Sequence, residues 1–311
     1  MSLLSVAREH YRVRARMARA LEREAARLWR QVDRANISGS WADLLPRLLV
    51  AVVAAQRASA AASDAYVAAA LAEQDASTGQ VGVNAAAFAG IASDGRNLGT
   101  LLAQPIITSK VALERGTTEA YALAAGQAAL QMIVATQVAD AGRVADGVAL
   151  TAQRRATGYV RMTVGRTCSR CLILAGKRYE WNQGFQRHPR CDCRHIPVAE
   201  DVPLSVQTSP KAAFDAMDRA EQDRVFTKAG AQAIREGADM GQVVNARKGM
   251  YTAAGRTLTA EGATRRGFAG ARLGAPRGQR AIRLMPEQIY REARGNRDEA
   301  LRLLRLHGYI L

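Results

Sequence analysis

The chain contains 311 residues, enough for one large domain or two modest ones with a hydrophobic core of their own. Lys and Arg outnumber Asp and Glu by 44 to 28, so the formal net charge is +16, and aromatic residues make up only 5%. These values disfavour secreted disulfide scaffolds and collagen-like chains, and they indicate a polyanionic partner or an acidic protein surface. The surplus of positive charge lies within residues 1–50, 151–200 and 251–311.

The N-terminal half has the pattern of long helices. An apolar stripe marks the first helix, and arginines occupy its other faces; the stripe consists of Val6, Val13, Met17, Leu21, Leu28 and Val32. We expect this helix to end at Ser38-Gly39-Ser40. A second helix is predicted from near Trp41 to Glu73, with Pro46 in its first turn.

The glycine-rich residues 76–100 predict a loop or a broken helix, and a third long helix is expected over about 117–150. Residues 120–139 form the longest uncharged stretch, but they are rich in Ala and contain three Gln. We therefore expect a buried or partner-facing helix there, with no membrane span, and we expect no secretory signal at the charged N-terminus.

All four cysteines follow a β-branched run, residues 158–165, that predicts a strand. A C-x-x-C turn places two thiolates on one side of a tight knuckle, as a tetrahedral Zn²⁺ ion requires. The spacing predicts a structural zinc site whose candidate ligands are Cys168, Cys171, His188, Cys191 and Cys193. The favoured set is Cys168, Cys171, His188 and Cys191. Cys193 is able to replace either His188 or Cys191, and His195 is a weaker candidate.

Two other states of these cysteines stay open. Disulfides need an oxidising compartment, and reduced thiols would leave a module held by hydrogen bonds and packing. The chain has no H-E-x-x-H, no deaminase signature and no G-x-S-x-G, so we assign no catalytic residue.

The C-terminal part returns to a helical pattern after Ser209-Pro210, with helices expected at about 210–218, 220–236 and 240–248. Glycines and arginines then alternate over residues 249–283, which we expect to form an extended basic arm. Its candidate contacts with nucleic acid or an acidic surface are Arg265, Arg266, Arg272, Arg277 and Arg280. The chain is expected to close with two short helices, the first after Pro286 and the second capped by Asn296 and ended by Gly308.

These patterns predict a mainly α fold, in which long Ala-rich helices precede a small α+β zinc-knuckle module and a helical C-terminal region. The expected parts are an N-terminal helical domain, the zinc-knuckle module, a helical segment, the basic arm and a C-terminal helical hairpin; their bounds are 1–157, 158–200, 201–248, 249–283 and 284–311.

The cysteine region also resembles a known signature. The run C-x-x-C-L-I-L-A-G-K-R-Y, followed by F-x-x-H-P-R-C-D-C-x-x-x-P, is similar to the carboxy-terminal pattern of the phage Mu protein F-like family of minor head proteins. The matching positions are Cys168, Cys171, Gly176, Lys177, His188, Pro189, Cys191, Cys193 and Pro197. The family often has an acidic residue at the position of Ala175 and Arg at the position of Asp192. Residues 225–250, 258–267 and 283–310 resemble minor capsid proteins of tailed actinobacteriophages.

The resemblance implies a structural virion component that is assembled in the host cytoplasm and located in the capsid interior or at the portal vertex. Such a minor capsid protein would act in head assembly, in DNA packaging or in DNA delivery. The implied partners are the portal, the major capsid protein and packaged double-stranded DNA, with a structural Zn²⁺ as cofactor and neither a membrane nor a small-molecule substrate. The alternatives are a capsid maturation protease, as some relatives are labelled, and a basic zinc-knuckle module that binds nucleic acid.

Overall fold

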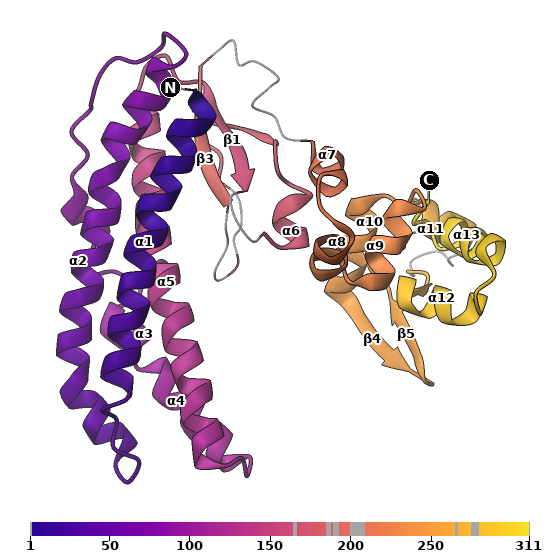
Figure 1. Ribbon diagram of the computed structural model, residues 1–311, viewed down its shortest axis with the longest axis horizontal. Coiled ribbons are helices and arrows are strands. Elements are labelled where there is room, and N and C mark those ends of the chain that lie inside the picture. Colours follow the sequence, from indigo (N-terminus) through magenta and orange to yellow (C-terminus); the bar gives the residue numbers. More distant parts are fainter. Residues whose placement is uncertain are drawn as a thin grey trace. The chain divides into compact units, whose positions relative to one another are not determined.

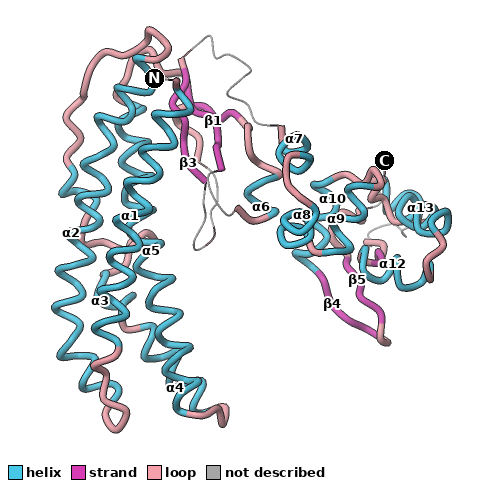
Figure 2. The backbone as a smooth tube through the Cα atoms, viewed as in Figure 1, coloured by secondary structure: helices cyan, strands magenta, loops and turns pink. Residues whose placement is uncertain are grey.

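A computed structural model describes residues 2–163, 167–184, 188, 193–199, 209–264, 267–274 and 280–310. Helices account for 62% of the structure and strands for 10%, and the described strands form two small antiparallel sheets (Figure 2). The fold is therefore mainly α, as the sequence predicts. The chain divides into two compact units: Met1–Val164 with Gly176–Gln207, and Gly165–Ala175 with Thr208–Leu311.

The first unit is built on three long helices that run side by side (Figure 1). These are α1 (Leu3–Trp29), α2 (Ile37–Ala72) and α5 (Glu119–Thr151). The shorter η1 (Ala85–Phe88), α3 (Leu98–Leu102) and α4 (Gln104–Glu114) lie between α2 and α5 in the sequence. Both α2 and α5 are long and apolar enough to cross a membrane by length and composition alone, a test that core helices of soluble proteins also pass.

The predicted boundary between the first two helices is wrong. Helix α1 ends at Trp29, and the Ser38-Gly39-Ser40 run lies in the first turn of α2. The side-chain oxygen of Asn36 accepts a hydrogen bond from the Gly39 amide at 3.0 Å, so Asn36 caps α2. Because this cap starts the helix before the Ser-Gly-Ser run, Pro46 lies inside α2 and not in its first turn.

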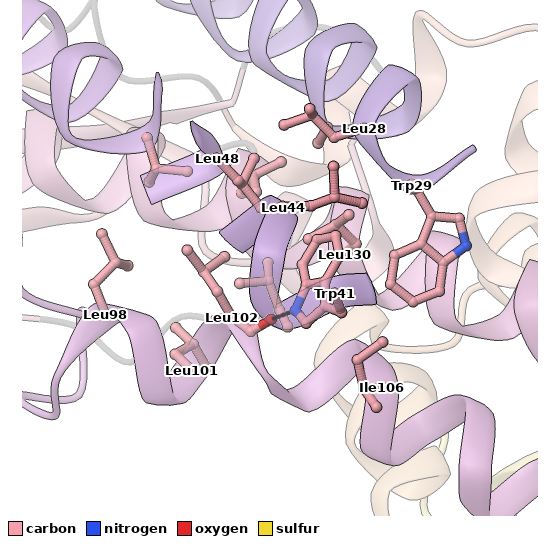
Figure 3. Packing of buried hydrophobic residues seen from close by; sticks show 14 of the residues in the cluster. Leu28, Trp29, Trp41, Leu44, Leu48, Leu98, Leu101, Leu102, Ile106 and Leu130 are labelled. Atoms are coloured by element: carbon pink, nitrogen blue, oxygen red, sulfur yellow. Dashed lines mark hydrogen bonds between the residues drawn. The ribbon is translucent and has the colours of Figure 1, made fainter. Parts of the chain in front are cut away.

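Two tryptophans anchor the core at one end of these helices (Figure 3). The rings of Trp29 and Trp41 meet edge to face, with centroids 5.2 Å apart. The indole Nε1 of Trp41 donates to the Leu102 carbonyl, and that of Trp29 donates to the Leu123 carbonyl, each at 3.0 Å. A buried indole N–H needs such an acceptor, so these bonds fix α1 and α2 against the segment from α3 to α5.

A three-stranded sheet closes the other end of the first unit. Its strands are β1 (Gly158–Thr163), β2 (Arg178–Glu180) and β3 (Cys193–Val198), in the order β2-β1-β3. The predicted strand at 158–165 is thus confirmed over residues 158–163. The Tyr66 hydroxyl donates to the His195 carbonyl at 2.6 Å, which ties α2 to β3.

The second unit is formed by short helices around one apolar core. Its first elements are α6 (Ser169–Leu172), α7 (Pro210–Asp215), α8 (Arg219–Phe226), α9 (Lys228–Arg235) and α10 (Met240–Ala246). The helix predicted over 220–236 is interrupted at Thr227, which adopts a φ of 65° and caps α9 through its hydroxyl. A β-branched residue in this conformation cannot continue a helix, so α8 and α9 are separate.

The segment 249–283 does not form the extended arm that the sequence predicts. After η3 (Arg247–Gly249), its described parts fold into β4 (Met250–Ala253), β5 (Arg256–Thr259), α11 (Phe268–Arg272) and β6 (Arg283–Leu284), with sheet order β4-β5-β6. Arg283 is completely buried, and its guanidinium donates to the carbonyls of His307 and Glu261. Fixed acceptors from distant parts of the chain therefore bring this arginine into the core.

The C-terminal hairpin is confirmed as α12 (Pro286–Ala293) and α13 (Arg297–Leu306). The side chain of Asn296 accepts from the Glu299 amide at 3.1 Å, and Gly308 adopts a φ of +68° just after α13. Both signals are local, which is why the sequence alone predicts them.

Candidate metal centre

The C-x-x-C motif lies at the start of α6. Cys168 is the N-cap residue, with an extended backbone at φ −91° and ψ 161°, and Cys171 lies within the helical turn. Residues three positions apart on a helical turn share one side of it, so the local backbone directs both thiols the same way. The Cys171 side chain is only 1% exposed, which keeps its sulfur away from bulk water.

An imidazole joins the two thiols. The ligand atoms of Cys168, Cys171 and His188 all lie within 4.8 Å of one another. Zn²⁺ binds thiolate sulfur at about 2.3 Å and imidazole nitrogen at about 2.0–2.1 Å, so ligand atoms around one ion lie within roughly twice those distances of each other. This group could hold a metal ion.

The other candidate ligands are not members of this group or lie outside the described residues. Cys193 is the first residue of β3, is completely buried, and is not part of the three-residue group. Its Sγ accepts a hydrogen bond from Arg161 Nε at 3.0 Å. The ring of His195, two residues further along β3, packs against Tyr159 with centroids 4.1 Å apart. Cys191 lies outside the described residues.

A second polar cluster, which the sequence analysis did not identify, is buried between α1, α2 and α5. Arg14 donates to both carboxylate oxygens of Asp146, at 2.5 and 2.9 Å, and also to the Ser59 carbonyl and the Ser63 hydroxyl. Arg14 and Asp146 are 3% and 2% exposed. His10 Nε2 lies 3.4 Å from the same carboxylate, and the His10 ring stacks on Tyr66. We call Arg14, Asp146 and His10 the buried ionic cluster.

The electrostatics of the buried ionic cluster follow from its enclosure. Burial alone raises the pKa of Asp146, but the charges of Arg14 and His10 outweigh it and hold that pKa well below its ordinary value. Burial lowers the pKa of His10, and Asp146 offsets only part of this effect. The cluster therefore pairs an ionised carboxylate with a guanidinium, while its imidazole resists protonation.

A serine, a histidine and an aspartate thus come close together, but they do not form a catalytic triad. The Ser63 hydroxyl accepts from Arg14 and donates to the Gly142 carbonyl at 3.3 Å, which directs it to neighbours other than His10. The Asp146 carboxylate is occupied by Arg14 in a bidentate pair. In a triad the base contacts the nucleophile and the carboxylate orients the base, and this arrangement is not formed here. The hydrogen bonds of Arg14 instead link α1 to α2 and α5.

The predicted basic contacts have varied surroundings. Arg272 is exposed, and its Nη1 donates to the carbonyl of Arg305 in the last turn of α13 at 2.6 Å and to that of Ile310, after the helix, at 2.8 Å. Arg280 is exposed and lies 3.9 Å from a carboxylate oxygen of Glu261. The other three predicted contacts lie outside the described residues; they are Arg265, Arg266 and Arg277.

No family model matches the chain, and no curated protein or solved structure matches it either.

Proposed function

We propose that this chain is a structural component of a tailed-phage virion, a minor capsid protein that acts in head assembly, DNA packaging or DNA delivery near the portal. The observation that carries the proposal is the convergence of Cys168, Cys171 and His188 within a run of residues that resembles the Mu protein F-like signature. The net charge of +16 adds support, because packaged DNA offers a dense array of phosphates inside a capsid. The proposed partners are the portal or the major capsid protein together with this DNA.

In this proposal the metal is a structural Zn²⁺. Two thiolates and an imidazole are the donors that Zn²⁺ prefers, and the buried position of Cys171 favours a closed site over an open one. Either Cys191 or Cys193 would supply the fourth ligand. The bound ion would stabilise the turn of chain around α6, because the free energy of ligation becomes free energy of folding. We propose no catalytic role for the site.

The proposal is tested on particles of the phage that encodes the chain. The chain is expected to copurify with intact virions. When it is purified under reducing conditions, it is expected to contain about one Zn²⁺ per chain, because four ligands of one chain surround a single ion. The variant Cys168→Ser removes one ligand and is expected to abolish stoichiometric zinc and to lower the yield of particles in complementation. Ser169→Ala, on the same turn, is the matched control and should retain zinc and yield.

The fourth ligand is found by comparing Cys191→Ser with Cys193→Ser, of which only one is expected to lose zinc. Absence of the chain from purified virions would refute the virion role. A metal-free wild-type chain with a fully assembly-competent Cys168→Ser variant would refute the structural zinc. Clipping of coexpressed major capsid protein that one point substitution abolishes would instead support the protease alternative.

A further inference from the structure

A row of arginines runs along one face of α1 and continues past the C-terminus of the helix. Its members follow one another at intervals of four or three residues and are all exposed. Arg8, Arg12, Arg16, Arg19, Arg23 and Arg27 lie in α1, Arg30 is its C-cap, and Arg34 lies in the loop that follows. On an ideal helix the positions from Arg8 to Arg27 fall within an arc of about 100°, and those from Arg8 to Arg30 span roughly 33 Å. We call these eight residues the α1 arginine row. Arg14 is on the other side of the helix and is buried.

Acidic neighbours neutralise only part of the row. Glu9 lies 3.5 Å from Arg12 and 3.3 Å from Arg16, and Glu24 pairs with Arg27. The other members have no ion pair with any residue that the structure describes; these are Arg8, Arg19, Arg23, Arg30 and Arg34. Because these exposed guanidinium groups form no ion pair with a described residue, the face of α1 attracts anions.

Three of these unpaired arginines border one hollow. The hollow has a volume of about 460 Å³ and lies between α1 and α5; it is lined by Arg19, Glu22, Arg23, Ala26, Arg30 and Gln131. Its three guanidinium groups outnumber its single carboxylate. Guanidinium groups bind phosphate oxygens through charge-assisted hydrogen bonds, so the hollow suits a phosphate group.

We propose that the α1 arginine row binds the phosphate backbone of double-stranded DNA without reading its sequence. Duplex DNA carries one negative charge per about 1.7 Å of its axis, so it presents a repeating anion along the whole length of the row. Residues 3–30 contain no Asn or Gln, the side chains that form bidentate contacts with adenine. Arginine binds phosphate oxygens as well as guanine, and we assign these contacts to the backbone because the charges follow one another along the length of the helix.

The side chains around the row favour duplex DNA over single-stranded nucleic acid and over an acidic protein surface. The large exposed hydrophobic residues include none from α1. Single-stranded nucleic acid is held by aromatic side chains on which bases stack, and a protein interface is anchored by buried aromatic or aliphatic side chains. The row offers charge without either kind of anchor, which matches the backbone of a duplex.

This inference deepens the proposed function, on which it rests for the source of the DNA. Its test needs only the purified full-length chain and synthetic DNA, so DNA binding can fail while the chain is still found in virions. Equally, the row can bind DNA if the chain proves absent from virions. The two failures are therefore distinguishable.

The experiment measures binding to a labelled duplex of about 30 base pairs by fluorescence anisotropy, at salt concentrations from about 50 to 200 mM. The test variant is Arg19→Gln/Arg23→Gln/Arg30→Gln, which removes the three arginines around the hollow. The matched control is Arg219→Gln/Arg297→Gln/Arg305→Gln, which removes the same charge from exposed helical positions of the second unit. Unchanged urea midpoints establish that both variants are folded.

Each phosphate contact contributes about −0.9 to the slope of log K, where K is the association constant, against log salt concentration. Loss of three contacts is therefore expected to make this slope less steep by roughly 2.7. Over the stated range the wild type would then lose roughly 40-fold more affinity than the test variant, whereas the control keeps the wild-type slope. A test variant with the wild-type slope, or a control with the same loss, overturns the proposal. Equal or tighter binding of the single strand, or of poly-L-glutamate at the same charge concentration, also overturns it.

Discussion

The buried ionic cluster makes a sharp prediction about stability. Asp146→Leu leaves the Arg14 guanidinium buried without its carboxylate, and Arg14→Met leaves the carboxylate buried without its cation. Because both side chains are at most 3% exposed, water cannot replace the missing partner. Breaking a buried pair in this way costs about 3–5 kcal/mol. We expect each single variant to lose that much of the free energy of unfolding.

The double variant Arg14→Met/Asp146→Leu is expected to be far more stable than the sum of the single losses implies. It leaves no uncompensated charge, and apolar replacement of a buried pair is often close to neutral. The expected coupling free energy is at least about 3 kcal/mol. The exposed pair Glu9 and Arg12, whose side chains are 54% and 66% exposed, is the control, and its cycle should couple by less than about 1 kcal/mol.

Urea unfolding followed by tryptophan fluorescence measures these values for the first unit alone. All three tryptophans belong to that unit: Trp29, Trp41 and Trp181. With a urea dependence of about 2–3 kcal/mol per molar, each single variant should lower the midpoint by roughly 1–2 M. A coupling free energy near zero for the buried pair would refute the conclusion that the two charges stabilise each other inside the fold.

Two further predictions concern close packing and pH. A Cβ added at Gly126 would lie 2.5 Å from Trp29, whereas one at Gly147 of the same helix would meet nothing within 4 Å. Gly126→Ala should therefore cost about 1–3 kcal/mol and Gly147→Ala should stabilise by up to about 1 kcal/mol, and urea midpoints that move in the same direction would contradict this. His307 accepts a hydrogen bond at Nδ1 from the Leu284 amide, and burial lowers its pKa to about 4. Between pH 6.5 and 4 this imidazole is protonated in the unfolded chain but not in the folded chain. The free energy of unfolding therefore has its full value above pH 6.5 and decreases by up to about 3 kcal/mol as the pH is lowered to 4. His307→Gln should lack this loss, as measured by hydrogen exchange of α12 and α13 at both ends of the range; equal pH dependence in both proteins would disprove it.

Local signals in the sequence predict much of this fold. The apolar stripe of α1, the strand at β1 and the cap that Asn296 forms with the Glu299 amide all depend on residues a few positions apart. The C-x-x-C motif is local as well, because one turn of helix is enough to direct both thiols the same way. Periodicity, capping and spacing therefore report the backbone conformation of each segment.

The start of α2 shows where local signals compete. Both Asn36 and the Ser-Gly-Ser run after it are suited to a helix boundary, and the pattern alone does not rank them. In the structure Asn36 supplies the cap, and Ile37, which follows it, is buried with the core that contains Trp29 and Trp41. Burial of apolar residues therefore selects the earlier start.

Tertiary structure alone decided which charges enter the core. In the sequence Arg14 is one arginine among many on the first helix, and Arg283 belongs to a segment rich in Gly and Arg. Arg14 meets Asp146 across 132 residues, and Arg283 meets the His307 carbonyl across 24. Burial of a guanidinium is tolerated only where acceptors from other segments surround it, and their arrival depends on how the helices pack. The sequence by itself therefore determined the long helices in outline, the strand β1 and the C-x-x-C turn, whereas packing determined where α2 begins and which partners the buried charges have.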